Sequence, residues 1–173
     1  NGNGKKVTVV TKSSTMKSKD LAAVTKTNLK SDATNNLSTF DRLVLSEYLD
    51  LDEKNFAKPE LESFKAAFKG YQKLKDEGKL EKNLLTIIDF TKSSTERRMW
   101  VIDMDKQEIL HHTVVSHGRN SGKEFASDFS NTPESFKSSL GFFTTAETYF
   151  GKHGLSLRLD GLEPGINDNA RDR

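Results

Sequence analysis

The sequence predicts an α+β fold in which an N-terminal pair of helices packs on a mainly antiparallel β-sheet. Between positions 43 and 74, apolar residues recur at steps of three and four, the spacing of helices with one buried face. After position 80 the pattern changes to short β-branched and aromatic runs separated by polar turns, which is typical of strands joined as hairpins. We therefore divide the chain into a polar, lysine-rich leader (1–36), a helical segment (37–80) and a β domain (81–173).

The leader holds a local excess of positive charge. Residues 1–30 contain seven lysines and one acidic residue, Asp20, whereas the whole chain of 173 residues has a net charge of only +2. Its Ser, Thr, Lys and Asn content is typical of a solvated tether. A basic arm that contacts an anionic polymer or a membrane surface is the alternative. Val7, Val9 and Val10 are compatible with one short strand within it.

Two helices are predicted in the helical segment. Ser38 or Thr39 is a suitable N-cap for a first helix that runs through Leu49. The second helix is expected to have Pro59 in its first turn and to stop at Gly78. Its apolar face is formed by Leu61, Phe64, Phe68, Tyr71 and Leu74. This face is expected to pack on the sheet that follows.

Five strands are predicted in the β domain. A three-strand meander is expected at residues 84–90, 99–104 and 109–115, and two further strands at 141–145 and 155–159. Between these two groups lies a long polar stretch, 116–138, rich in Ser, Gly and Asn. Residues of this kind favour turns and loops, so we expect this stretch to be irregular.

Composition excludes several classes of protein and site. The near balance of 27 basic and 25 acidic residues argues against a dedicated nucleic-acid-binding protein. No apolar run approaches the roughly 18 to 20 residues that span a bilayer, so no membrane span is predicted. The absence of cysteine excludes disulfides, thiolate metal sites and a cysteine nucleophile within these residues. Because His111 and His112 are neighbours on a strand they face opposite sides, and we expect no metal and no cofactor.

A series of short segments follows the predicted meander. They read S-H-G-R-N-S-G at 116–122, S-S-L-G-F at 138–142, Y-F-G-K-H-G at 149–154 and G-I-N-D-N-A-R at 165–171. In this order they resemble the catalytic domain of the murein L,D-transpeptidases, in the variant branch of the YkuD-like family. The resemblance covers residues 40–173 and implies the sheet or sandwich of that family.

The resemblance also implies a chemistry. In this family a cysteine thiolate, activated by a histidine, attacks the carbonyl between an L-centre and a D-centre of a peptidoglycan stem peptide. The terminal D-alanine leaves, and an amine from a neighbouring stem resolves the thioester into a crosslink. The family's His-Gly strand and S-x-G-C segment follow the G-I-N-D-N-A-R stretch, so no catalytic residue is carried over. We expect the catalytic residues beyond Arg173 and expect this chain to be the front part of the domain, inactive alone.

Substrate-binding residues are predicted from the chemistry of the stem peptide. Its carboxylates and amides suit arginine side chains and loops rich in hydrogen-bond donors. The candidates are His117, Arg119, Asn120, Ser138, Ser139 and Arg158. Each has a structural alternative, because polar loop residues usually satisfy nearby backbone groups. For Arg158 the alternative is an ion pair with Asp160 or Glu163.

The predicted function is therefore that of a peptidoglycan L,D-transpeptidase that acts on stem peptides. The alternatives are an L,D-carboxypeptidase, in which water replaces the acceptor amine, and a non-catalytic wall-binding or structural domain. From the resemblance we expect an exported protein of the bacterial cell envelope or periplasm. A sheet that lacks its last strands has an unpaired edge, so we also expect either a retained C-terminal fragment or an edge-strand dimer.

Overall fold

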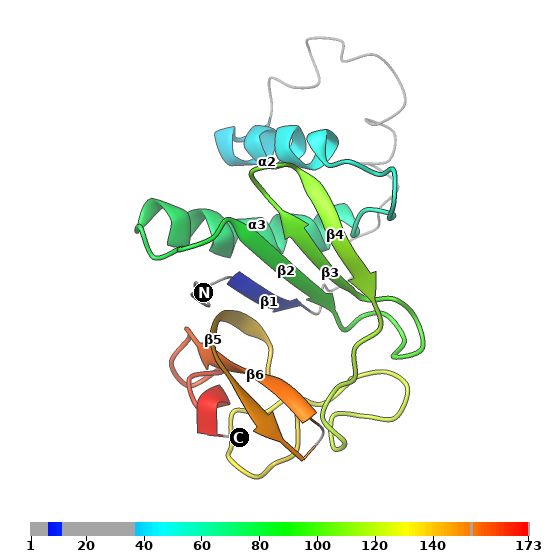
Figure 1. Ribbon diagram of the computed structural model, residues 1–173, viewed down its shortest axis with the longest axis vertical. Coiled ribbons are helices and arrows are strands. Elements are labelled where there is room, and N and C mark those ends of the chain that lie inside the picture. Colours follow the sequence, from blue (N-terminus) through cyan, green and yellow to red (C-terminus); the bar gives the residue numbers. More distant parts are fainter. Residues whose placement is uncertain (1–6, 12–36, 153, 173) are drawn as a thin grey trace.

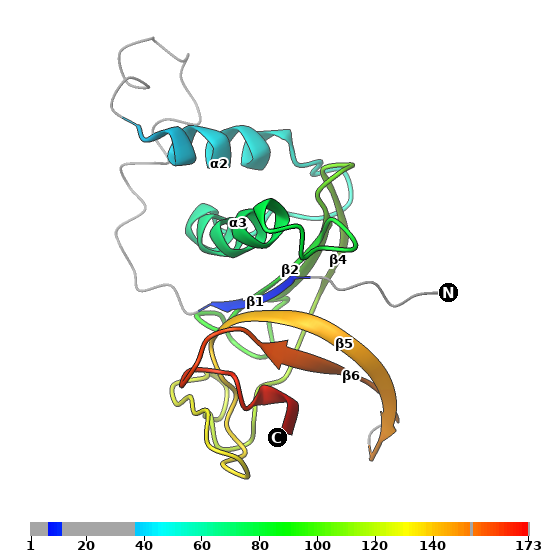
Figure 2. The same ribbon diagram turned by 90° about the vertical axis from the view of Figure 1, so that its left-hand side faces the viewer.

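A six-stranded sheet forms the centre of the computed structural model, which describes residues 7–11, 37–152 and 154–172. The helices are α2 (Thr39–Asp50) and α3 (Leu61–Asp76), and the strands are β1 (Val7–Thr11), β2 (Leu84–Asp89), β3 (Met99–Asp103), β4 (Glu108–Thr113), β5 (Gly141–Gly151) and β6 (Gly154–Gly161), with a short 3₁₀ turn η1 (Ala170–Asp172). The strand order is β4-β3-β2-β1-β5-β6, and only the β1–β2 pair is parallel. Helix α3 covers β1 and β2, and α2 packs beside α3 (Figure 1, Figure 2). The predicted α+β architecture is confirmed.

Strand β1 is internal to the sheet although it lies in the segment assigned to the leader. It pairs in parallel with β2, with Val9 opposite Ile87, and antiparallel with β5, with Val9 opposite Phe142. The short strand predicted at Val7, Val9 and Val10 is thus confirmed. These five residues are part of the central sheet, because backbone hydrogen bonds on both sides outweigh their polar sequence context. Residues 1–6 and 12–36 lie outside the described residues.

The helix boundaries follow identifiable capping contacts. Ser38 is the N-cap of α2, and its hydroxyl accepts a hydrogen bond from the Asp41 amide. Helix α3 begins two residues after Pro59, so the prediction of Pro59 in its first turn is wrong. The Pro59 carbonyl instead accepts a hydrogen bond from the Tyr48 hydroxyl, at 2.8 Å. Gly78 ends α3 as predicted, because its φ of +64° is the left-handed conformation that this cap requires.

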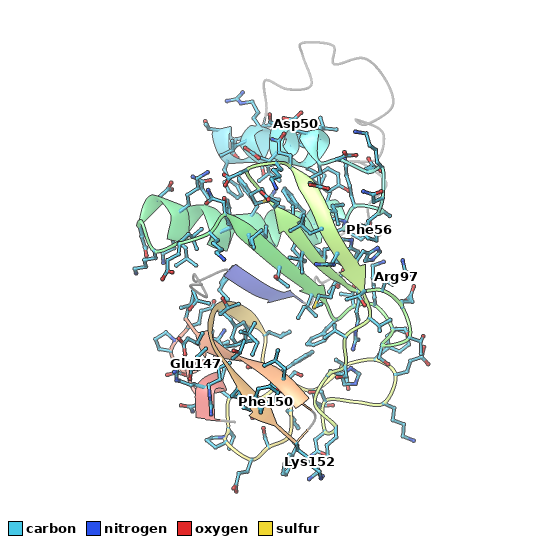
Figure 3. The ribbon with its side chains drawn as sticks, viewed as in Figure 1. Asp50, Phe56, Arg97, Glu147, Phe150 and Lys152 are labelled. Atoms are coloured by element: carbon cyan, nitrogen blue, oxygen red, sulfur yellow. The ribbon has the colours of Figure 1, made fainter. Side chains whose placement is uncertain are left out.

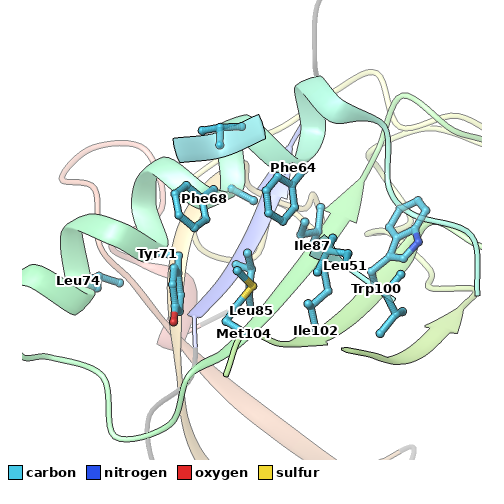
Figure 4. Packing of buried hydrophobic residues seen from close by; sticks show 13 residues of the cluster. Leu51, Phe64, Phe68, Tyr71, Leu74, Leu85, Ile87, Trp100, Ile102 and Met104 are labelled. Carbon is cyan, nitrogen blue, oxygen red and sulfur yellow. The ribbon is translucent and has the colours of Figure 1, made fainter. Parts of the chain in front are cut away.

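The main hydrophobic core lies between α3 and the sheet. One face of α3 packs against side chains of β2, β3 and β4 in a continuous buried cluster (Figure 4). The helix contributes Phe64, Ala67, Phe68, Tyr71 and Leu74, and the strands contribute Leu85, Ile87, Trp100, Ile102 and Ile109. Burial raises the pKa of the Tyr71 hydroxyl to about 12. The apolar face predicted for the second helix therefore has the predicted partner.

A second, smaller core lies between the sheet and the long loop that joins β4 to β5. It joins Ile88 and Phe90 to Phe143 of β5 and to Ala126, which lies in the long loop between β4 and β5. Strand β5 is longer than the predicted 141–145, because its pairing with β6 continues to Gly151 opposite Gly154. The β5–β6 hairpin projects from the rest of the sheet (Figure 2). This second core fixes the loop against the sheet and thereby defines the site described below.

Gly70 provides a test of the packing between α3 and β5. The Phe142 ring lies directly on the Gly70 backbone, and a Cβ added there would overlap it. Alanine in a helix is favoured over glycine by about 1 kcal/mol, whereas overpacking costs about 1–3 kcal/mol. We expect Gly70→Ala to lower the free energy of unfolding by about 1 kcal/mol. Urea denaturation measures the free energy of unfolding, and Lys69→Ala on the exposed face of the helix is the control. A Gly70→Ala protein more stable than the wild type would contradict this packing.

Candidate substrate-binding site

A cavity of about 810 Å³ lies between the sheet and the β4–β5 loop (residues 114–140). Strands β2, β5 and β6 supply its apolar wall, and the loop supplies much of its polar wall. On the side of the sheet the apolar side chains include Ile88, Phe90, Phe143, Leu157 and Leu159. Such a combination of an apolar surface and a few polar groups is typical of small-ligand and peptide sites.

Four of the six predicted substrate-binding residues line this cavity. Arg119, Ser138 and Ser139 reach it from the loop, and Arg158 reaches it from β6. His117 and Asn120 are not part of the lining; they hold the loop together, as described below. The tertiary structure thus brings together side chains from two distant parts of the sequence.

Positive charge dominates the polar lining. Among the described residues that border the cavity, the basic side chains are Arg119, Lys137, Arg158 and Arg171, and the acidic one is Glu134. Lys137 and Arg171 were not predicted as site residues. Arg171 is the last residue of the G-I-N-D-N-A-R segment, and its place in that segment is the sequence signal that could have indicated it.

Arg158 and Arg171 are neutralised by carboxylates at the rim. Arg171 binds both Asp160 and Glu147, and the contact to Glu147 is 2.8 Å. Arg158 lies 3.3 Å from Glu147 and stacks over the Tyr149 ring, so its partner is neither Asp160 nor Glu163. The hydrogen bond to Asp160 raises the pKa of Arg171. The pKa of Glu147 is lowered, first by a hydrogen bond from the backbone amide of Glu147 and then by the charge of Arg171. Both guanidinium groups therefore have internal partners.

Arg119 differs from the other two arginines of the cavity. It is exposed, and it forms no ion pair with any residue in the described ranges. Its guanidinium carbon lies 3.8 Å from the centroid of the Phe136 ring. An arginine held against an aromatic ring, without a carboxylate partner, retains its hydrogen-bond donors for a ligand. Of the three arginines that line the cavity, Arg119 is the best suited to bind an anion.

The fully buried guanidinium of Arg98 anchors the start of the β4–β5 loop. It donates to the Val115 carbonyl from Nε at 3.1 Å and from a terminal nitrogen at 2.8 Å, and to the Lys92 carbonyl at 3.0 Å. Its guanidinium also lies 4.8 Å from the Phe90 ring centroid. Burial lowers the pKa of Arg98, and the charge of Asp89 opposes this effect. Nothing in the sequence distinguishes this arginine from its exposed neighbour Arg97.

His117 has a structural role next to Arg98. Its Nδ1 lies 2.8 Å from a terminal nitrogen of Arg98, and its Nε2 lies 3.3 Å from the Gly122 carbonyl. Because an arginine can only donate, Nδ1 accepts and the proton resides on Nε2. Both ring nitrogens are thus engaged within the protein, and the predicted substrate role of His117 has no support from this geometry.

Asn120 and Ser138 connect the two halves of the β4–β5 loop. The Asn120 side chain donates to the Ser135 carbonyl at 2.9 Å, and the Ser138 hydroxyl accepts from the Gly118 amide at 2.9 Å. The Ser138 amide in turn donates to the buried hydroxyl of Ser121, at 2.8 Å. These contacts are the structural alternative considered for polar loop residues. Ser138 combines such a contact with a place in the cavity lining.

Buried hydrogen bonds of Asn167 and Glu163, which the sequence did not predict, join the C-terminal segment to β5. The Asn167 side chain is fully buried and donates to the carbonyls of Leu140 and Phe142, at 3.0 and 3.2 Å. The Glu163 carboxylate accepts from the Phe142 amide at 2.9 Å. Gly141, with a φ of +110°, allows the close approach of Glu163. These hydrogen bonds hold the segment that carries Arg171 beside the cavity.

The described part of the chain has neither a metal-binding cluster nor a membrane-spanning helix. In residues 7–11, 37–152 and 154–172, no three His, Cys, Asp or Glu side chains are arranged to hold a metal ion. His112 stacks on Trp100 with ring centroids 4.5 Å apart. Over the same residues, neither helix has both the length and the apolar character needed to cross a membrane.

Comparison with known proteins identifies the family. A family model of the L,D-transpeptidase catalytic domain matches residues 56–173. The chain belongs to this family. The match begins after α2, so the part of the resemblance at 40–55 stays a prediction. No curated protein and no solved structure matches the chain.

Family membership assigns the cavity to an L,D-transpeptidase domain. The loop and strands that form it all lie within the matched residues. The family implies peptidoglycan as the class of substrate and the cell envelope as the place of action. The cavity is therefore a candidate surface for a peptidoglycan component.

Arg98 provides a stability test of the loop anchor. Lysine keeps the charge at position 98 but cannot supply the planar set of donors that reaches Val115, Lys92 and His117. We expect Arg98→Lys to lower the free energy of unfolding by about 2–4 kcal/mol, because buried acceptors lose their donors. Urea denaturation measures the loss, and Arg97→Lys is the matched control, expected to change stability by less than about 0.5 kcal/mol. Equal stability of the two variants would contradict an anchoring role.

Proposed function

We propose that the protein is a peptidoglycan L,D-transpeptidase whose reactive cysteine and histidine lie outside these 173 residues. The thiolate attacks the carbonyl between the L-centre and the D-centre of a stem peptide, a C–S bond forms, and the C–N bond to D-alanine breaks. D-alanine leaves with a proton. The amine of a second stem then attacks the thioester, a C–N bond forms, the C–S bond breaks, the amine gives a proton to the histidine, and the thiolate is regenerated. Family membership and the absence of cysteine from the sequence support this proposal.

The observation that carries the proposal is the uncompensated Arg119 beside an apolar wall. A stem peptide presents free carboxylates next to short aliphatic side chains. Arginine binds a carboxylate through two parallel N–H···O bonds, and Phe143, Leu157 and Leu159 offer contact to aliphatic groups. Ser138 and Ser139 border the same space. We propose these residues, together with Arg158 at the rim, as the binding surface for the stem.

Two alternatives use the same surface. In an L,D-carboxypeptidase, water replaces the acceptor amine, and the product is a shortened stem without a crosslink. In a wall-binding or structural domain the stem binds and no bond breaks. Incubation of the full-length protein with a tetrapeptide muropeptide, followed by mass spectrometry, separates them. A transpeptidase yields D-alanine and a crosslinked dimer, a carboxypeptidase yields D-alanine alone, and a binding domain yields neither. The 173-residue chain is expected to release no D-alanine, since it has no thiol nucleophile.

Arg119 is expected to determine affinity for stem carboxylates. Charge-assisted hydrogen bonds contribute about 1.5–3 kcal/mol, so Arg119→Ala is expected to weaken binding of a stem tripeptide by about tenfold or more. Isothermal titration calorimetry gives the dissociation constant, with Arg97→Ala as control because Arg97 is exposed and lies outside the cavity (Figure 3). Unchanged affinity in Arg119→Ala, or an equal loss in Arg97→Ala, would remove the main support for the proposal.

We also propose that the edge of β6 pairs with a further strand, supplied by a segment that follows Arg173 or by a second copy. Strand β6 is at one end of the sheet, and the hairpin carries exposed apolar side chains, with Phe150 86% and Leu155 67% exposed. Phe150 is labelled on the hairpin in Figure 3. An apolar edge strand is a template for pairing. Light scattering and intact mass are expected to reveal a dimer or a bound fragment, and Leu155→Lys to weaken it. A monodisperse 19.4 kDa monomer would contradict this proposal.

Export to the bacterial envelope or periplasm is proposed from the family alone. The division into a helical segment (37–80) and a β domain (81–173) is proposed with one change, because residues 7–11 add a strand to the β domain.

A further inference from the structure

We infer that Asn120 and Phe136 are positioning residues that hold the guanidinium of Arg119 ready for a carboxylate. The inference rests on the proposed function, because it gives a structural cause for the preference for anionic peptides that this function predicts for the same cavity. The inference concerns the segment 134–136, which has no regular secondary structure and contributes Glu134 and Phe136 to the lining of the cavity.

Segment 134–136 has an unusual backbone. Glu134 and Phe136 have φ angles of +57° and +54°, in the left-handed region. Residues other than glycine seldom adopt this conformation, and two within three positions need contacts from outside the segment to hold them. In the described chain the other such residue is Gln107, at the β3–β4 turn. The strained backbone is thus concentrated at the cavity.

Asn120 provides those contacts. The backbone amide of Asn120 donates to the Phe136 carbonyl at 3.0 Å, and the side-chain amide donates to the Ser135 carbonyl at 2.9 Å. Two consecutive carbonyls of the strained segment are therefore fixed by one residue. Gly118 permits this approach, because a Cβ there would lie 2.5 Å from the Phe136 carbonyl oxygen. The two halves of the loop are consequently held close enough for Arg119 and Phe136 to meet.

The orientation of Phe136 determines what Arg119 offers to a ligand. Phe136 is 53% exposed, so its ring is held by the backbone and by Arg119 rather than by a core. The guanidinium carbon lies over the Phe136 ring, 3.8 Å from its centroid. A planar guanidinium stacked on an aromatic face keeps the N–H donors along its edge available for a ligand. This geometry suits two parallel hydrogen bonds to one carboxylate. A guanidinium ordered before binding loses less conformational entropy when the ligand arrives.

The test measures selectivity rather than affinity alone. The full-length protein is titrated with a stem tripeptide that has free carboxylates and with the same peptide in amidated form. The ratio of the two dissociation constants is compared for wild type, Arg119→Ala, Asn120→Ala, Phe136→Leu and Phe136→Tyr. We expect a wild-type preference of about tenfold for the carboxylate form. Asn120→Ala and Phe136→Leu should each reduce it by about threefold, and Phe136→Tyr should retain it because the aromatic face remains.

Double variants decide whether the two residues act through Arg119. In the Arg119→Ala background, Asn120→Ala and Phe136→Leu are expected to have no further effect on the ratio. If Arg119→Ala alone leaves the ratio unchanged, the proposed binding of stem carboxylates by Arg119 fails, and the present inference fails with it. If Arg119→Ala removes the preference while Asn120→Ala and Phe136→Leu preserve it, only the present inference fails. Equal weakening of both peptides by Asn120→Ala or Phe136→Leu would indicate a merely structural role and would also overturn it. Melting temperatures monitor folding, and because both side chains are exposed, they are expected to stay near the wild-type value.

Discussion

The buried guanidinium of Arg98 is the contact on which the candidate site depends. It fixes the carbonyls of Val115 and Lys92 and orients His117, so it determines where the β4–β5 loop leaves the sheet. The cost of burying a cation is offset by two carbonyl acceptors, the His117 nitrogen and the Phe90 ring, together with the nearby charge of Asp89. From this anchor the loop folds back onto the sheet, and the cavity is the space that remains between them.

The arginines of the cavity region illustrate three uses of one side chain. Arg98 satisfies backbone carbonyls in the interior. Arg158 and Arg171 form ion pairs with Glu147 and Asp160 and so tie the C-terminal segment to the β5–β6 hairpin. Arg119 has only an aromatic partner among the described residues. A guanidinium that already binds carboxylates must exchange partners to bind a ligand, whereas Arg119 needs only to lose water. This difference is the reason why we propose Arg119 for substrate binding.

The loop and the C-terminal segment achieve order without regular secondary structure. Asn167, Glu163 and Ser121 make hydrogen bonds with backbone groups that a helix or strand would otherwise satisfy. In the described part of the chain, every buried side-chain nitrogen and oxygen has a hydrogen-bond partner. The positions of Arg119 and Arg171 are therefore set by many local hydrogen bonds. Single substitutions in this network are expected to shift the cavity wall while the main core is retained.

Most helices and strands could be predicted from the sequence, because their periodicity and caps are local properties. The apolar spacing from Leu61 to Leu74, the cap at Ser38 and the stop at Gly78 each had a local physical cause, and the structure agrees. The ordered series of loop segments also pointed to the family. The tertiary structure alone decided that β1 lies inside the sheet, that Arg98 is buried while Arg97 is exposed, and that His117 is an internal partner while Arg119 is not. These outcomes depend on contacts between residues far apart in the chain, and no local pattern encodes them.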